Sequence, residues 1–281
     1  MTQKYPGGKV VYSPGTVIIS AIGECTDIQK TVKTALIPQE GTKILYLDFS
    51  KDAAKLAGSS LYQALNKVGQ EPPTVVDAAY FANAFETVQQ LISQGLVLAG
   101  HDISSGGILT ALLEMCFPSQ SAGIQVDVAQ LDEKDLVKAF FSENPGILIQ
   151  VEANGEVENL LAAAQIEFKT LGTVTLTSKI ELASQTLAVS EWRDLWFRSS
   201  YLLDKKQSGE KLALERFTNY KNQPLQYSFS TGWEGKFANL GLDPFRTTKG
   251  KATAAIIREK GVNGDREMAY SLWLAGFEVK D

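Results

Sequence analysis

The sequence contains little histidine or cysteine and no excess of positive charge, and each shortage excludes a class of function. One histidine and two cysteines among 281 residues cannot supply a histidine-rich or cysteine-rich zinc site. Cys25 and Cys116 lie in apolar contexts without CxxC spacing, so no disulfide is indicated. The 27 basic residues are outnumbered by 32 acidic ones, and a net charge of -5 disfavours binding to nucleic acids or anionic membranes.

Long apolar runs are also missing. The apolar stretches are strand-sized, well short of the roughly 20 residues that span a bilayer, and residues 1–15 contain no apolar core of a signal peptide. We therefore expect a cytoplasmic protein. Hydrophobic residues still make up 44% of the chain, which is enough for the core of one large or two medium domains.

Short β-branched runs alternate with amphipathic segments as far as about residue 190, which indicates an α+β or α/β domain. This alternation is compatible with an open sheet covered on one face. We expect strands over 16–24, 43–50, 96–100, 123–128, 146–151 and within 166–189. We expect helices over 26–36 (with Thr26 as N-cap), 58–68, 77–95, 108–116, 132–140 and 155–164.

The pattern changes after residue 190. Residues 191–207 and 209–217 are predicted to form two helices that pack Trp192, Trp196 and Leu203 inward.

Residues 219–252 show no period and indicate a connector, longer than loops in compact domains usually are. A strand-turn-helix-strand pattern then starts afresh, in a segment too short to bury its own sheet. The chain is therefore expected to stop inside a second domain. Three parts are predicted, over 1–190, 191–252 and 253–281.

The run HDISSGG follows the apolar segment LVLAG and opens a predicted helix. This order turns backbone N–H groups and the positive end of a helix dipole toward a ligand, as in many phosphate sites. Asp102, at the strand end, suits Mg²⁺ that is held partly by phosphates. Ser104 can donate a hydrogen bond to a phosphate oxygen, while Gly106 and Gly107 let the phosphate come close.

A purely structural interpretation of this run stays open. Asp102 and Ser104 would then cap the helix, and the two glycines would form a tight turn. His101 is interpreted as an ordered structural residue rather than as a catalyst. A second possible anion niche at 58–60, formed by Gly58, Ser59 and Ser60, is interpreted as simple helix capping.

Runs of residues in two parts of the chain resemble the large-type phosphoribosylformylglycinamidine synthase family. The last synthetase subdomain of that family is similar to SPGTVIISA (13–21), GHDISSGGILTALLEMCF (100–117), GIQVDV (123–128) and ENPGILIQV (143–151). Residues 254–281 resemble the opening of its class I glutaminase domain. The resemblance implies a C-terminal-type subdomain of the aminoimidazole ribonucleotide synthetase-like fold, then a connector and an incomplete, flavodoxin-like glutaminase start.

Members of this family are ATP-dependent ligases of purine biosynthesis that use glutamine as nitrogen donor. They convert formylglycinamide ribonucleotide, glutamine and ATP into formylglycinamidine ribonucleotide, ADP, phosphate and glutamate. The resemblance implies that Asp102 coordinates Mg²⁺ and that Ser104, Gly106 and Gly107 bind ATP, as part of a shared site. It implies no catalytic residue in this chain, because the family's glutaminase triad lies beyond residue 281.

The glutaminase-like run contains a turn that resembles the family's GxN turn. Gly261 and Asn263 are interpreted as turn-forming residues near a glutaminase site.

One position departs from the family pattern. Ser105 stands where members often carry an acidic residue, which leaves one fewer carboxylate near the metal. We expect a Mg-nucleotide half-site that is inactive alone and has the remaining synthetase and glutaminase domains of the same polypeptide as partners. Two alternatives stay open: a non-catalytic scaffold or glutaminase-docking module with the same fold, and a related synthetase such as aminoimidazole ribonucleotide synthetase or selenophosphate synthetase.

Overall fold

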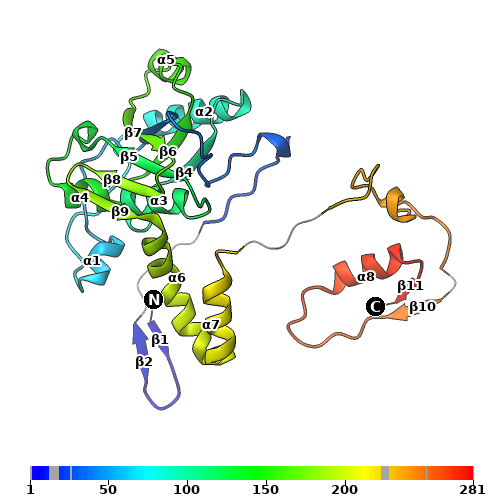
Figure 1. Cartoon of the computed structure of the whole chain (residues 1–281). Coiled ribbons are helices and arrows are strands. Elements are labelled where there is room, and N and C mark those ends of the chain that lie inside the picture. Colours follow the sequence, from blue (N-terminus) through cyan, green and yellow to red (C-terminus); the bar gives the residue numbers. More distant parts are fainter. Residues whose placement is uncertain (1, 13–18, 26, 223–227, 251, 281) are drawn as a thin grey trace. The chain divides into compact units, whose positions relative to one another are not determined.

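The computed structural model describes residues 2–12, 19–25, 27–222, 228–250 and 252–280 (Figure 1). The chain divides into two compact units, Met1–Phe217 and Thr218–Asp281. No helix within the described ranges is both long and apolar enough to cross a membrane.

The first unit is built on a seven-stranded mixed sheet, with the strand order β4-β6-β3-β7-β5-β8-β9. Neighbouring strands are antiparallel except for β5 and β8, which are parallel. A mixed sheet with helices between its strands confirms the α+β class expected from the sequence. The strands are β3 (Lys43–Asp48), β4 (Ala99–Asp102), β5 (Gly123–Val126), β6 (Gly146–Val151), β7 (Lys169–Thr175), β8 (Lys179–Leu182) and β9 (Gln185–Ala188).

Helices and a small hairpin complete this unit. The hairpin, which the sequence pattern did not predict, pairs β1 (Thr2–Lys4) with β2 (Val10–Tyr12). The helices are α1 (Ser60–Ala64), α2 (Ala78–Ser93), α3 (Gly107–Cys116), α4 (Leu136–Phe141), α5 (Glu156–Ala163), α6 (Val189–Ser208) and α7 (Glu210–Asn219), with short 3₁₀ turns at Ile28–Lys30 and Val128–Gln130.

Helices cover both faces of the sheet, so the expectation of a sheet covered on one face was wrong. Successive strand side chains point to opposite faces, and on β3 both sets are packed. Leu45 and Leu47 join one core with α2 and α5, whereas Ile44 and Tyr46 pack into the other with α3 and α4. Figure 1 shows these two helix pairs on opposite sides of the strands. The apolar run of β3 is typical of strands buried on both faces.

The segment before β3 differs most from the prediction. Residues 19–25 form no strand, and only Ile28–Lys30 is helical in the range where a longer helix was expected. Residues 13–18 and the expected N-cap Thr26 lie outside the described residues. The segment is held by tertiary contacts instead, because the buried Leu36 donates its N–H to the carbonyl of Met115 at 2.9 Å.

The strand predicted over 96–100 is found two to three residues later, as β4. The pairing of β4 with β6 runs from Ala99 to Asp102, so His101 and Asp102 belong to the strand rather than to the loop after it. The backbone ladder, which a sequence pattern does not reveal, decides where this strand ends.

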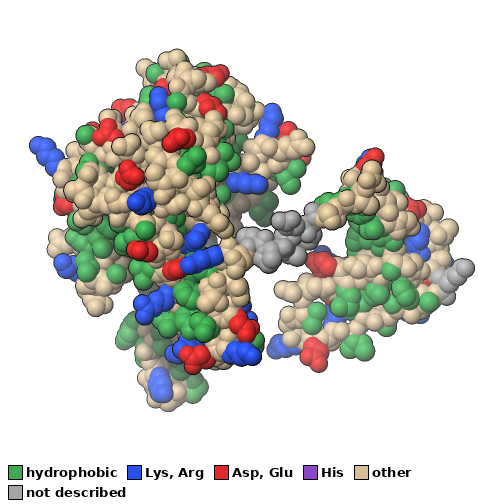
Figure 2. Space-filling model, in the orientation of Figure 1, with side chains coloured by type: hydrophobic (Ala, Val, Ile, Leu, Met, Phe, Trp, Pro, Cys, Tyr) green, Lys and Arg blue, Asp and Glu red, His purple; other side chains and the backbone are tan. Residues whose placement is uncertain are grey.

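Helices α6 and α7 lie where they were predicted, but their large side chains do not all pack inward. Trp192, Trp196 and Leu203 are 38%, 49% and 58% exposed. Figure 2 shows apolar side chains among charged ones in this part of the first unit. Trp196 lies on the surface of α3, where its Nε1 donates to Glu114 Oε1 at 3.2 Å.

The second unit contains a parallel pair, β10 (Thr253–Ala255) and β11 (Glu278–Lys280), joined through α8 (Asp265–Leu274). A 3₁₀ turn at Phe237–Leu240 lies in the preceding connector. Parallel neighbours need such a crossover, and the predicted strand-turn-helix-strand pattern is confirmed. Arg246 ties the connector to this unit, donating to the carbonyls of Trp273 (3.0 Å) and Phe277 (2.9 Å).

Candidate functional site

Two strands end in aspartate, and both end on the same side of the sheet, where β6 begins. β3 ends at Asp48 and β4 at Asp102, and both strands pair antiparallel with β6, opposite Gly146 and Ile147. The two aspartates are therefore two strand spacings apart, roughly 10 Å. The predicted loop that contains Asp102 and the segment that precedes β6 both lie at this end of the strands.

Asp102 is open to solvent, with 75% of its side chain exposed. The neighbouring His101 is only 12% exposed and faces protein atoms on both sides. Its Nδ1 lies 2.7 Å from the carbonyl oxygen of Asp102, and its Nε2 lies 3.2 Å from Glu114 Oε2 on α3. His101 thus fastens the strand end to α3, in agreement with its structural interpretation, and the Asp102 carboxylate stays accessible.

Glycines shape the turn between β4 and α3. Gly106 and Gly107 have φ angles of +88° and +69°, in the left-handed region that glycine adopts without a Cβ clash. A Cβ on Gly107 would lie 2.4 Å from the carbonyl oxygen of Phe140 and 2.8 Å from that of Ser142. Glycine at 107 therefore lets the start of α3 pack against the end of α4.

The backbone N–H groups of this loop are partly used within the protein. Gly106 donates its N–H to Glu143 Oε1 at 2.8 Å, and Gly107 donates to the carbonyl of Ser104 at 3.0 Å. Within the described ranges, the N–H groups of Ser104 and Ser105 have no protein acceptor. These two amides are therefore the ones open to an anion in front of the loop. Glu143 was missed at the sequence level, because nothing local marks it as a partner of Gly106.

The structural interpretation of the second glycine-serine run is confirmed. Ser59 is the N-cap of α1, and its Oγ accepts from the N–H of Tyr62 at 3.3 Å and donates to the carbonyl of Leu56 at 2.7 Å. The N–H of Ser60 donates to the carboxylate of Glu143. The Ser59 hydroxyl is thus occupied by capping contacts, and the N–H of Ser60 by a tertiary contact.

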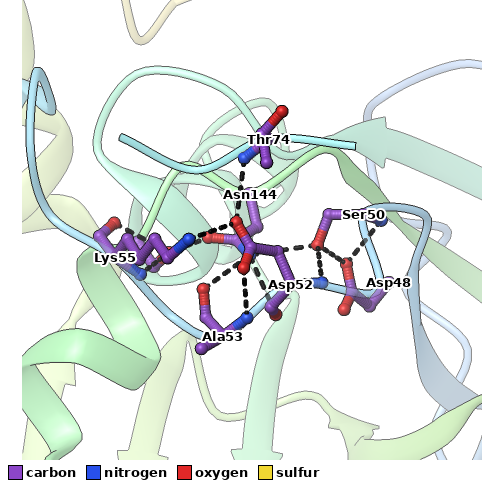
Figure 3. A network of polar contacts seen from close by, with 8 residues as sticks. Asp48, Ser50, Asp52, Ala53, Lys55, Thr74 and Asn144 are labelled. Carbon is purple, nitrogen blue, oxygen red and sulfur yellow. Dashed lines mark hydrogen bonds and ion pairs between the residues drawn. The ribbon is translucent and has the colours of Figure 1, made fainter. Parts of the chain in front are cut away.

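A buried polar network fixes the chain after β3 and the segment before β6 (Figure 3). Asn144, only 5% exposed, donates from Nδ2 to Ser50 Oγ (3.0 Å) and to the carbonyls of Asp52 (3.3 Å) and Ala53 (3.1 Å). Ser50 in turn donates its N–H and Oγ–H to Asp48 Oδ1, at 2.8 and 2.6 Å. The side-chain amide of Asn144 therefore joins the start of β6 to the chain that follows β3.

Asp52 anchors the other side of this network. Its Oδ2 accepts from Lys55 Nζ at 2.8 Å and from the N–H of Thr74 at 3.1 Å. The hydrogen bond from Lys55 is the largest cause that holds the pKa of Asp52 below its ordinary value, and backbone N–H groups add to it. The carboxylate is thus stabilised in its charged form.

Replacing Asn144 with alanine is expected to lower the free energy of unfolding by about 2 kcal/mol, because buried acceptors lose their donor. Asn159→Ala is the matched control: Asn159 is exposed on α5, and this change should stay within about 0.5 kcal/mol. Urea unfolding followed by circular dichroism measures both. Equal stabilities of the two variants would contradict the role of Asn144.

The residues at this end of the strands can supply part of the ligands of a metal ion, but not a complete set. Within the described residues, no three His, Cys, Asp or Glu side chains are grouped to hold a metal ion. Asp102 can still offer one accessible oxygen to Mg²⁺, an ion that keeps several waters and takes further ligands from phosphates.

Gly261 and Asn263 lie in the second unit, in the turn that precedes α8. Gly261 has a φ of +95°, as expected of a turn-forming residue. Their predicted proximity to a glutaminase site stays a prediction.

Comparison with known proteins extends over nearly the whole chain. The model of a family described as AIR synthase related protein, C-terminal domain, matches residues 39–184. The probable phosphoribosylformylglycinamidine synthase of Arabidopsis thaliana, named chloroplastic/mitochondrial, is 33% identical over 98% of this chain and 20% of its own length. The Homo sapiens phosphoribosylformylglycinamidine synthase is 32% identical over 98% of this chain and 21% of its own length.

The chain thus spans about a fifth of the length of the curated relatives it matches. Among solved structures, phosphoribosylformylglycinamidine synthase II from Thermotoga maritima covers 58% of this chain and 27% of its own, with 15% identity and a TM-score of 0.44. The resemblance to the phosphoribosylformylglycinamidine synthase family is confirmed by the two relatives aligned over 98% of the chain. The assignment of residues 254–281 to a glutaminase opening stays a prediction.

Proposed function

Since the chain belongs to the family of AIR synthase related protein C-terminal domains, we propose that it works as one segment of a phosphoribosylformylglycinamidine synthase. In that role it takes part in the ATP- and glutamine-dependent conversion of formylglycinamide ribonucleotide to formylglycinamidine ribonucleotide. The observation that carries the proposal is the alignment of 98% of the chain with one continuous fifth of such enzymes.

Within this role, the loop after β4 provides half of a magnesium-nucleotide site. Asp102 supplies one ligand to the magnesium ion. Ser104, with the turn formed by Gly106 and Gly107, faces the phosphates of ATP. The support is geometric: the carboxylate is exposed at a strand end, and the N–H groups of Ser104 and Ser105 have no protein acceptor in the described part of the chain. Magnesium would neutralise phosphate charge there.

Other polypeptide regions must complete this site. A single carboxylate and two amides bind a nucleotide weakly, so the chain alone is expected to bind MgATP with a Kd on the order of 1 mM or weaker. Isothermal titration calorimetry of the isolated chain tests this expectation. A Kd far below that value would show a self-sufficient site rather than a half-site.

We further assign residues 253–281 to the beginning of a glutaminase domain, which follows the helical segment and connector predicted over 191–252. The parallel pair of β10 and β11 joined through α8 supports this assignment, since such crossovers build parallel sheets. The cytoplasmic location expected from the sequence stays a prediction.

An exchange experiment tests the proposal. In the exchange enzyme, residues 1–281 replace the aligned segment of the Arabidopsis thaliana relative. It should hydrolyse ATP only when formylglycinamide ribonucleotide and glutamine are both present, whereas the relative without this segment should be inactive. Size-exclusion chromatography first establishes that the exchange enzyme is folded. A folded but inert exchange enzyme would contradict the proposed function.

Two observations favour the alternative of a non-catalytic scaffold with the same fold. Glu143 occupies the N–H of Gly106, and Ser105 adds no second carboxylate beside Asp102. If the chain is only a scaffold, the exchange enzyme should keep its activity after Asp102→Asn. If the chain provides a half-site, that variant should lose activity.

A further inference from the structure

A cavity lies beside the buried polar network, on the α3–α4 face of the sheet. Its volume is about 330 Å³, within the range of small-molecule sites. Tyr46 and Asp48 of β3 line it from one side, and Lys169 of β7 pairs with Tyr46 in the sheet register. Ile108, Leu131 and Ala139 form apolar parts of its wall. The cavity thus combines apolar wall residues with polar groups that come from the sheet and from the loops around it.

Carboxylates dominate the charge of this lining, but most of them are paired. Three of the five lining carboxylates form ion pairs: Asp52 with Lys55 (2.8 Å), Glu167 with Lys51 (2.6 Å) and Asp132 with Lys169.

The two remaining lining carboxylates, Asp48 and Glu133, have no ion pair within the described ranges. The net charge left over in the cavity is therefore negative, which excludes phosphates and other anions as good ligands.

Asp48 has spare hydrogen-bonding capacity at this place. Its Oδ1 accepts both bonds from Ser50, and Figure 3 shows its other oxygen without a contact to the residues drawn. Tyr46, two residues earlier on the same face, has a hydroxyl without a partner among the described residues. Burial, with a smaller effect of Asp48, raises the pKa of Tyr46, so its hydroxyl stays a neutral donor and acceptor.

We propose that this cavity binds a small organic cation, an amidinium, guanidinium or primary amine on a compact apolar body, with its positive group at Asp48. The N–H groups of such a ligand donate to the free carboxylate oxygen, a charge-assisted bond that is stronger than a neutral one. Its apolar body fills the space along Ile108, Leu131 and the ring of Tyr46. The proposal goes beyond the proposed function and does not depend on it, since the ligand carries the charge opposite to that of a nucleotide.

Benzamidine and benzoate test this proposal on the unaltered chain, because they share a flat ring and carry opposite charges. The measurement is a titration of the ¹⁵N-labelled chain by heteronuclear NMR at constant ionic strength. Benzamidine should shift the amides of Ala53, Ser142 and Lys169 with a Kd of about 1 mM. Benzoate should bind at least about tenfold more weakly. Equal binding of the two probes, or shifts confined to other regions, would overturn the proposal.

Asp48→Asn removes the charge and keeps an oxygen for the bonds from Ser50, so the variant should fold. It should bind benzamidine at least about tenfold more weakly. Asp77→Asn is the matched control, since Asp77 Oδ1 also accepts the N–H two residues ahead, at the start of α2. That variant should bind benzamidine as the wild type does. Undiminished affinity in Asp48→Asn would refute the assigned site.

Discussion

Alanine at position 107 is expected to lower the free energy of unfolding of the first unit by about 3 kcal/mol or more. Gly107 is buried with a φ of +69°, and the left-handed conformation alone costs roughly 1–2 kcal/mol for a residue with a Cβ. The new Cβ would also lie 2.4 Å from the carbonyl oxygen of Phe140. The atoms it meets are backbone atoms, so relief requires shifting α4 against α3, an overpacking cost of about 1–3 kcal/mol.

Gly155→Ala separates the two contributions. Gly155 has a φ of +80° at the start of α5, but a Cβ there would meet nothing within 4 Å. This variant should lose only the conformational part, about 1 kcal/mol. Urea unfolding, followed by NMR through the amide signals of the central sheet, measures the free energy of unfolding of both variants. Equal losses at 107 and 155 would show that the contact with α4 is unimportant.

Neutralising Asp102 in the exchange enzyme is expected to lower kcat/KM at least about 100-fold, since a metal's charge stabilisation is worth several kcal/mol. Asp102→Asn keeps the size of the side chain and removes the anionic ligand. Asp102 is exposed, and the ion-pair contact of its carboxylate is with the adjacent His101, whose Nδ1 lies 3.5 Å from Asp102 Oδ1. Loss of so exposed a contact should change stability by less than about 0.5 kcal/mol.

Asp127→Asn is the matched control for this change. Asp127 caps a 3₁₀ turn through the N–H of Ala129, and asparagine caps equally well. Steady-state ADP formation should be unaffected in this variant. If Asp102→Asn behaves in the same way as the control, the chain is a scaffold, and the half-site assignment is wrong.

The sequence predicted the elements in which local signals agree with tertiary packing. α2 has a cap at Asp77, apolar residues at helical spacing and a glycine of positive φ at Gly95, and it was found within two residues of its predicted ends. The segment before β3 has apolar residues too, but Leu36 is held by the backbone of α3 rather than by a repeating local pattern. Local periodicity therefore predicted regular structure there that is absent.

The candidate site was predictable where its residues are consecutive in sequence. The order of strand, Asp102, glycine pair and helix follows directly from residues 99–107. Glu143 and Asn144 were missed, because their roles depend on how the end of α4 reaches the loops after β3 and β4. The cavity beside Asp48 was missed for the same reason.

The most direct measurement of the central claim is the affinity of the exchange enzyme for ATP with and without Mg²⁺, determined by calorimetry for wild type and Asp102→Asn. If Asp102 holds the metal, the variant should lose about 10- to 100-fold in affinity for MgATP. Its affinity for ATP in the presence of EDTA should equal that of the wild type. An equal loss under both conditions, or no loss under either, would contradict the assignment of Asp102 as a magnesium ligand.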